Sequence, residues 1–512
     1  MPILDITPLG SARSGTAGAV AAIVDYLTRP AQPANPGLEG PTGYYADRAQ
    51  RPGVWRGRGV NGQPLTDEAT AEQLSRLLLG AHPTNGAVLV ASTGSSGRAA
   101  RDRQRPPGAA QHGASLDVAQ TAALLGVDPS YVKRLLLATE RHERDPEHQP
   151  APMQPLHGAR DGAGRWRVEP GEAQRFISAR TEPKVVVAYD PTFKWEKSIS
   201  AAWVQADPAT RKVIEDALDL GVRAGIAYLE THGLDVRAGE QRIAADGMWA
   251  IQYRHTSNRN LEPQLHDHVV IANIAADPNG NTRTIAARAL FTHATTAGHL
   301  AGQAVRHHLT EQLGYEWGPV RNGTCDLAHI HPTPLSAIST RSAEVRELAA
   351  TYGADSQQAR RIAALSTRKH KQAQTDPAAL EERWSETLSY WGFTPEHERD
   401  LHRRARPVPF RDTDIAKLQA FLDSPNGITK QCALFDRDDV VRAVIAWDGQ
   451  QGGGARLTAD QVERETTRWL ASEAVVRLDH HDTRTPRYTT ASMLQLETDV
   501  LAGLPPRHQR PR

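Results

Sequence analysis

Three histidines and an apolar tail mark residues 255–273, which read His255-Thr-Ser-Asn-Arg-Asn-Leu-Glu-Pro-Gln-Leu-His266-Asp-His268-Val-Val-Ile-Ala-Asn273. The pattern in His266–Asn273 predicts a β-strand, in which every second side chain lies on the same face. His266 and His268 therefore share one face, while Asp267 points to the other. His255 ends a second predicted strand, Trp249–His255, and the loop between the two strands can return the chain so that all three imidazoles meet.

Three neutral imidazoles on one face can bind a divalent metal ion and leave coordination positions for phosphate oxygens. The alternative is that histidines on a buried strand serve packing alone. Two other histidine pairs, in His329-Ile-His331 and Asp479-His-His-Asp482, lack an apolar strand around them and are predicted to lie in surface loops. The third histidine on a partner strand therefore favours a metal site at His255, His266 and His268.

The bulk composition limits the class of protein. A chain of 512 residues is too long for one hydrophobic core and predicts several domains. With 39% hydrophobic and 23% charged residues, and no apolar run of membrane-spanning length, we expect a cytoplasmic protein without membrane insertion. The start of the chain does not have the pattern of a signal peptide, and the two cysteines, Cys325 and Cys432, suit a reducing compartment. Because the net charge is +1, any nucleic-acid site must come from local clusters.

Changes in composition and periodicity divide the chain into five predicted parts. An α+β domain with an antiparallel sheet is expected to be interrupted by an inserted module, and a mostly helical region follows it. The Gly-, Ser- and Arg-rich residues 92–114 are expected to form a linker. The predicted parts are 1–114 (first part of the α+β domain), 115–180 (inserted module), 181–320 (second part, with the metal site), 321–409 (helical region) and 410–512 (small terminal domain).

The inserted module has the pattern of a helix-turn-helix. Apolar residues at helical spacing flank Gly126, and Asp128 with Pro129 is typical of the start of a second helix. The stretch from Gly164 onward resembles the small wing and closing helix of excisionase-like DNA-binding domains. The alternative is a module that serves helical packing alone. If the module binds DNA, the residues facing a groove are Ser130, Tyr131, Lys133 and Arg134, with Arg165 and Arg167 near the DNA backbone.

Further candidates for chemistry are a carboxylate and three tyrosines. Asp190 follows the predicted strand Lys184–Tyr189, where it can orient an imidazole, accept a proton or cap a turn. Tyr26, Tyr44 and Tyr45 are candidate nucleophiles. Since a phenol has an ordinary pKa of about 10, a metal ion or a base must help to form the phenolate.

Together these motifs resemble the TrwC/TraI-type (MobF) conjugative relaxases of the HUH endonuclease superfamily. The resemblance covers residues 1–320 apart from the insert, and it implies an antiparallel sheet flanked by helices, the HUH relaxase fold. It rests on the N-terminal tyrosines with Trp55-Arg-Gly-Arg-Gly, on Asp190-Pro-Thr-Phe-Lys-Trp-Glu-Lys-Ser-Ile-Ser, on Arg254-His255 with Arg259, and on the histidine stretch. Two departures are the single Tyr26, preceded by Asp25 where a second tyrosine is common, and Pro191, which replaces an apolar residue.

The resemblance implies a role for each candidate residue. His255, His266 and His268 become ligands of one divalent ion, Mg or Mn, with Zn or Ni as alternatives. Asp190 becomes a base or a histidine-orienting carboxylate, Arg259 neutralises phosphate charge, and Tyr26 makes the first attack. Tyr44 or Tyr45 performs the second transfer.

The implied reaction is the nicking of one DNA strand at an origin of transfer through a 5′-phosphotyrosine, followed by religation. Implied partners are single-stranded and duplex origin DNA, a coupling protein and a type IV secretion apparatus. Parts of residues 410–505 resemble the start of the helicase region of longer relaxases. The sequence has no Gly-x-x-x-x-Gly-Lys-Ser/Thr nucleotide-binding loop, so we expect no ATP use. A separate helicase is a further candidate partner. Two alternatives are a rolling-circle replication initiator and a non-catalytic protein that binds DNA through the helix-turn-helix.

Overall fold

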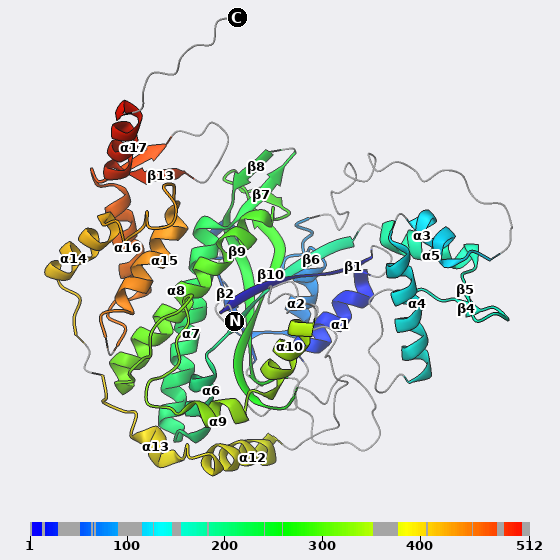
Figure 1. Cartoon of the computed structure of the whole chain (residues 1–512), viewed down its shortest axis with the longest axis horizontal. Coiled ribbons are helices and arrows are strands. Elements are labelled where there is room, and N and C mark those ends of the chain that lie inside the picture. The colour runs from blue at the N-terminus through cyan, green and yellow to red at the C-terminus, as the bar shows by residue number, and fades with distance from the viewer. Residues whose placement is uncertain are drawn as a thin grey trace, which may run out of the picture.

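A central antiparallel sheet organises the computed structural model of the chain (Figure 1). The structure describes residues 3–12, 16–28, 52–62, 65, 68–90, 115–125, 127–145, 155–181, 184–239, 241–258, 260–351, 377–405, 408–452, 454–478 and 486–503. The strand order is β1-β6-β10-β9-β2-β3, with β11 beside β10. Their bounds are Leu4–Ala12 (β1), Lys184–Lys194 (β6), Pro263–Ala276 (β10), Asp246–Ser257 (β9), Gly53–Arg56 (β2), Glu68–Ala69 (β3) and Thr282–Arg283 (β11).

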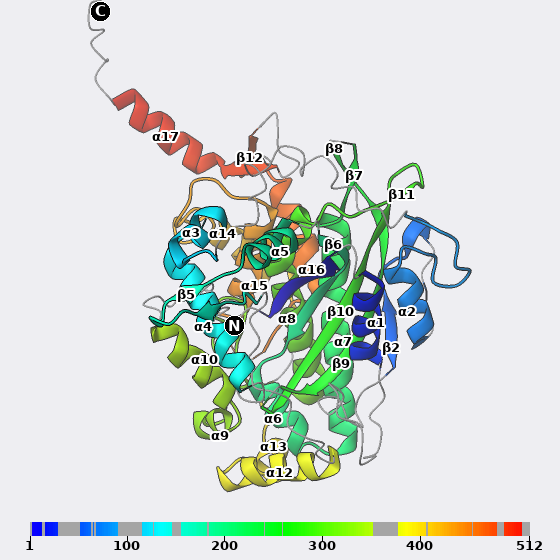
Figure 2. The same ribbon diagram turned by 90° about the vertical axis from the view of Figure 1, so that its right-hand side faces the viewer.

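Helices cover both faces of this sheet, so its central strands are buried on both sides. The helices α7 (Pro208–His232) and α8 (Arg288–Leu313) pack on one face, where Leu265 and Val269 of β10 join the larger hydrophobic cluster. The helices α1 (Thr16–Thr28) and α2 (Ala71–Leu78) pack on the other face, where Val270 and Ala272 of β10 join a second cluster. Figure 2 shows α1 and α2 on one side of the strands and α8 with the C-terminal helices on the other. The predicted α+β class with an antiparallel sheet is therefore confirmed.

The central strand β6 runs further than the sequence predicted. From the β-branched pattern we expected a strand that ends at Tyr189, with Asp190 just beyond it. In the structure β6 continues to Lys194, and Pro191 pairs with Ile6 of β1. The expectation was wrong because the φ of proline fits an extended strand, and Pro191 removes only one backbone N–H donor from β6. Pairing of the neighbouring residues with β1 and β10 holds this part of β6 in the sheet. Asp190 consequently lies inside the sheet.

The inserted segment forms a small unit with its own hydrophobic cluster. Asp128 caps the second helix by accepting from the Ser130 N–H at 2.8 Å, and Pro129 is its first residue, as the sequence predicted. Gly126 lies outside the described residues. The elements are α3 (Val118–Leu125), α4 (Pro129–Arg144), β4 (Ala159–Arg160), β5 (Trp166–Arg167) and α5 (Pro170–Thr181). The boundaries of this module stay a prediction.

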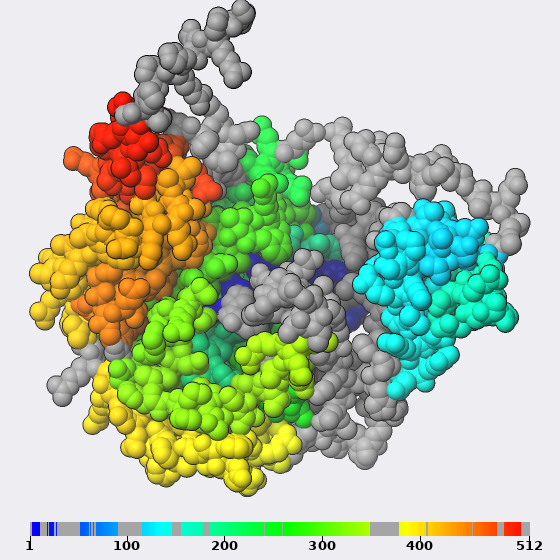
Figure 3. Space-filling view, in the orientation of Figure 1, coloured from blue at the N-terminus to red at the C-terminus, as the bar shows by residue number. Residues whose placement is uncertain are grey.

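The remaining elements are mostly helices that extend the larger cluster. Helices α15 (Arg437–Asp448) and α16 (Ala459–Leu470) pack on α8 (Figure 3, where the C-terminal part is orange and α8 is green). The larger hydrophobic cluster therefore includes residues from Ile3 to Trp469. None of the helices that the structure describes is both long and apolar enough to span a membrane. The further bounds are Val60–Gly62 (η3), Lys197–Gln205 (α6), Asp235–Ala238 (β7), Gln241–Ala244 (β8), Pro332–Ala337 (α9), Thr340–Thr351 (α10), Pro377–Tyr390 (α12), Pro395–Arg399 (α13), Asp412–Asp423 (α14), Arg437–Asp448 (α15), Ala459–Leu470 (α16), Val475–Leu478 (β12), Arg487–Thr490 (β13) and Ala491–Gly503 (α17).

Candidate metal centre

The structure brings His255, His266 and His268 together on the sheet face that carries α1 and α2. In the register of β9 and β10, His255 lies opposite His266, and the alternation along β10 puts His268 on the same face. One side-chain nitrogen from each histidine lies within 4.8 Å of the other two, and the ring centroids are 5.0 to 5.3 Å apart. This is a spacing at which three ligand atoms can surround one ion.

Two of the three rings are held by hydrogen bonds through Nδ1. The His266 Nδ1–H donates to the backbone oxygen of Gln264 at 2.9 Å. The His268 Nδ1–H donates to Asp190 Oδ2 at 2.8 Å, and Thr192 Oγ1 lies 3.4 Å from the same nitrogen. Because Nδ1 carries the proton in each case, the lone pair is on Nε2, which is the usual arrangement behind a metal-ligating histidine.

Burial keeps the imidazoles of His255 and His266 neutral. It lowers the pKa of His255 well below the ordinary value, and the nearby His268 and His266 lower it further. Burial, followed by the charge of His268, lowers the pKa of His266 to about 3. A neutral imidazole has the free lone pair that a metal ion needs, so the residues present fit a divalent ion.

Asp267, between the two histidines, anchors a buried network on the opposite face of the sheet. It accepts hydrogen bonds from Trp195 Nε1 at 2.7 Å, Gln252 Nε2 at 2.7 Å and Arg254 Nε at 2.9 Å. Arg254 also reaches Asp219 of α7 through Nη2 at 2.7 Å. The sequence predicted that Asp267 points away from the metal site but not these partners, because Trp195 and Asp219 are distant in sequence.

Helix α1, which contains the predicted nucleophile, packs on the sheet face that carries the histidines. Tyr26 belongs to α1, whose Val20 and Leu27 pack in the same cluster as Trp249 and Ile251 of β9. The side chain of Tyr26 lies outside the described part of the chain. Also outside it are Tyr44, Tyr45, Arg259 and the predicted linker 92–114.

The predicted surface histidines differ from this site. His329 is exposed, and its Nε2 lies 2.8 Å from Glu316 Oε2. His331 is also exposed and caps the N-terminus of α9. The surface-loop prediction is confirmed for this pair, whereas residues 479–482 are outside the described ranges.

The model of the TrwC relaxase family matches residues 20–390. The chain belongs to the TrwC relaxase family. The chain is 30% identical to the multifunctional conjugation protein TraI of Escherichia coli (strain K12) over 302 residues. This match covers 56% of the chain and 16% of that protein. A second Escherichia coli TraI is 29% identical over 274 residues, 50% of this chain and 15% of its own length. The matches thus span about a sixth of the length of these relatives.

Among solved structures, the chain is similar to the conjugative relaxase TrwC in complex with oriT DNA. The metal-bound complex is 17% identical with a TM-score of 0.46, and the copper-bound complex is 18% identical with a TM-score of 0.47. Each comparison covers 77% of this chain and 99% of the TrwC chain.

Proposed function

We propose that this relaxase nicks one DNA strand at an origin of conjugative transfer and forms a covalent bond between Tyr26 and the DNA. The observation that carries the proposal is the cluster of three histidines, two of them oriented through Nδ1, on the sheet face where α1 packs. Membership of the TrwC relaxase family and the name of the relative TraI, a conjugation protein, support the same function.

The proposed chemistry is a transesterification. The Tyr26 phenol oxygen forms a bond to phosphorus, the bond from phosphorus to the 3′ oxygen breaks, and the phenol proton passes in net terms to that oxygen. The products are a 5′-phosphotyrosine and a free 3′-hydroxyl. Attack by a 3′-hydroxyl in the reverse direction religates the strand, and Tyr44 or Tyr45 is the proposed nucleophile for a second cut.

The chain's own residues hold the reacting groups in position. A divalent ion held by His255, His266 and His268 would supply Lewis acidity at the scissile phosphate. Asp190 keeps the proton of His268 on Nδ1 and fixes the ring, since it accepts at 2.8 Å. Arg259 is proposed to neutralise phosphate charge. We propose Mg or Mn as the ion, although imidazoles also suit Zn or Ni.

The proposed setting is that of a conjugative relaxase. Single-stranded and duplex origin DNA are the substrates, and a coupling protein with a type IV secretion apparatus would receive the covalent complex. A separate helicase would unwind the duplex, and the reaction would take place in the cytoplasm.

The experiment that tests this function is mapping of a covalent protein–DNA adduct. Nick sites are first mapped on a supercoiled plasmid library with Mg, Mn, Zn or Ni, and an oligonucleotide carrying a mapped site is then the substrate. We expect Tyr26→Phe to eliminate the adduct, because phenylalanine has no nucleophilic oxygen. The matched control Tyr390→Phe, at an exposed position of α12, retains it. An adduct on Tyr44 or Tyr45 in the first turnover would reverse the order of the tyrosines, and an adduct on no tyrosine would refute the mechanism.

A further inference from the structure

We propose that the inserted module is a double-stranded DNA recognition site, with α4 as the helix that enters the major groove. This site is separate from the metal centre, and the proposal does not depend on nicking. The first observation is the arrangement of charge on α4. The others concern the wing, the hairpin formed by β4 and β5: the ion pairs of its Arg165 and Arg167, and its packing against α4.

A basic stripe lies opposite the buried face of α4. Val132, Leu136 and Thr139 are buried in the module. At about 100° per residue, Lys133, the three arginines of α4 and Ser130 fall within an arc of roughly 100° on the other side. The half-buried Leu137 also lies in this arc, whereas His142, Glu140 and Glu143 fall outside it. We call this set the α4 stripe, and its members, all exposed, are Ser130, Lys133, Arg134, Arg141 and Arg144.

The charge of the α4 stripe is largely available to a partner. Within the described residues, Lys133, Arg134 and Arg141 form no ion pair, and Arg144 alone is paired, with Glu140 at 2.8 Å. Protein interfaces depend on buried aromatic or aliphatic anchors, whereas a stripe dominated by basic side chains fits the phosphates and groove edges of DNA.

The length of α4 assigns different parts of the stripe to different parts of DNA. Ser130 and Arg144 are about 21 Å apart along the helix axis, at about 1.5 Å per residue. The major groove is only about 12 Å wide. The N-terminal members Ser130, Lys133 and Arg134 therefore reach base edges, and Arg141 with Arg144 reaches the phosphates at the rim.

The wing contributes less charge than the sequence indicated. Asp161 accepts from Arg165 Nε at 3.2 Å and from Arg167 Nε at 3.1 Å. The backbone N–H of Arg165 is the largest cause that lowers the pKa of Asp161, to about 2, so this carboxylate stays charged and partly neutralises both arginines. We therefore assign the main electrostatic contact to α4 rather than to Arg165 and Arg167.

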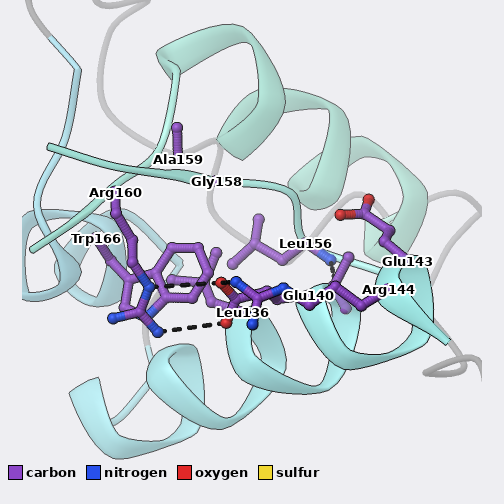
Figure 4. Close-up of a pocket in the computed structure, with 10 residues that line it drawn as sticks. Leu136, Glu140, Glu143, Arg144, Leu156, Gly158, Ala159, Arg160 and Trp166 are labelled. Carbon is purple, nitrogen blue, oxygen red and sulfur yellow. Dashed lines mark hydrogen bonds and ion pairs between the residues drawn. The ribbon is translucent and has the colours of Figure 1, made fainter. Parts of the chain in front are cut away.

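The wing nevertheless supports α4 as a rigid partner. Arg160 lies over the Trp166 ring, 4.5 Å from its centroid, and its Nη2 is 3.3 Å from Glu140 Oε2 of α4 (Figure 4). Trp166 is itself buried in the module cluster with Leu136. These contacts hold the wing against one flank of the helix and leave the α4 stripe open.

The proposal is tested by measuring the binding of the full chain to two probes of one mixed sequence, a 30-base-pair duplex and the 30-nucleotide single strand. We expect the double variant Lys133→Ala/Arg134→Ala to bind the duplex about tenfold more weakly, with a salt slope lower by about 2, and to bind the single strand within twofold of the parent. The control Lys417→Ala, on α14, changes neither affinity. Equal losses on both probes, or no loss on the duplex, would overturn the proposal.

A second measurement tests base reading and does not require nicking. The full chain selects sequences from a random duplex library, and the same selection is repeated with Arg134→Ala. An enriched motif that changes in the variant supports an α4 helix in the groove, because arginine reads guanine edges through paired hydrogen bonds. The absence of any motif, or the same motif in both selections, would overturn that placement.

Discussion

At the residue scale, the site depends on the groups behind the histidines as well as on the histidines. Asp190 Oδ2 holds His268, and the Gln264 carbonyl oxygen holds His266, each through Nδ1. Such partners fix the tautomer and the ring plane, and losing one typically costs 10- to 100-fold in metal affinity. The contact from Thr192 to His268 is longer, at 3.4 Å, and should contribute less.

We predict that Asp190→Asn weakens Mn²⁺ binding about tenfold, because a neutral amide is a poorer acceptor than a carboxylate for the His268 Nδ1–H. Calorimetric titration of Mn²⁺ into the DNA-free protein measures this loss. Thr192→Val is the matched control on the same strand and should change the affinity less than twofold. A loss in Thr192→Val as large as that in Asp190→Asn would show that the carboxylate has no special role.

At the element scale, the pairing of β9 with β10 is reinforced beneath the metal site. Asp267 and Arg254 are 0% and 4% exposed, and the Arg254 guanidinium connects β10 to Asp219 of α7. A one-residue slip of β10 would move Asp267 to the histidine face and the histidines to the face that carries α7 and α8. The buried ion pair therefore favours the register that assembles the three histidines.

We predict that Asp267→Leu lowers the free energy of unfolding by about 3 to 5 kcal/mol, because the buried Arg254 guanidinium loses one of its two carboxylate partners. The double variant Asp267→Leu/Arg254→Met should cost at least 1 kcal/mol less than the sum of the single changes, since it removes both charges. Urea unfolding at neutral pH gives all three values. Strictly additive costs would argue against coupling between the two side chains.

At the scale of the whole molecule, the C-terminal helices complete the core of the sheet domain. A polar contact accompanies the apolar packing: Asp438 of α15 accepts from Tyr228 of α7 and from His293 Nδ1 of α8 at 2.9 Å. Burial raises the pKa of Asp438, but the hydrogen bonds from His293 and Tyr228 outweigh it, so the pKa is lowered from the ordinary 3.8. A lowered carboxyl pKa stabilises the fold above pH 3.8, and this contribution is lost as the pH falls through the folded-state pKa.

We predict that Asp438→Asn lowers the free energy of unfolding by about 1 to 3 kcal/mol at pH 7, because the asparagine cannot accept both hydrogen bonds as a carboxylate does. The difference in unfolding free energy between the variant and the parent should shrink as the pH is lowered below 3.8. There the parent carboxylate becomes protonated and is then neutral, as the asparagine is. Urea unfolding at a series of pH values measures both effects, with the exposed Asp412→Asn as control. A difference that does not depend on pH would contradict the charged role of Asp438.

The sequence by itself determined which local elements form and which side chains share a face. The alternation around His266 and His268 placed both rings together because a strand repeats every two residues, and Asp128 with Pro129 marked the start of α4 through purely local hydrogen bonding and φ. Helix α7 forms for the same reason, since its apolar period and its cap at Asp207 are local.

Only the tertiary structure decided the contacts between distant segments. The register of β9 on β10 put His255 opposite His266, the continuation of β6 through Pro191 brought Asp190 to His268, and packing on α8 joined α15 and α16 to the sheet domain. These outcomes depend on backbone pairing and on the burial of apolar surface between segments far apart in the chain. No local pattern encodes such partners, and this is why the sequence predicted the ligands of the metal centre but not the network that holds them.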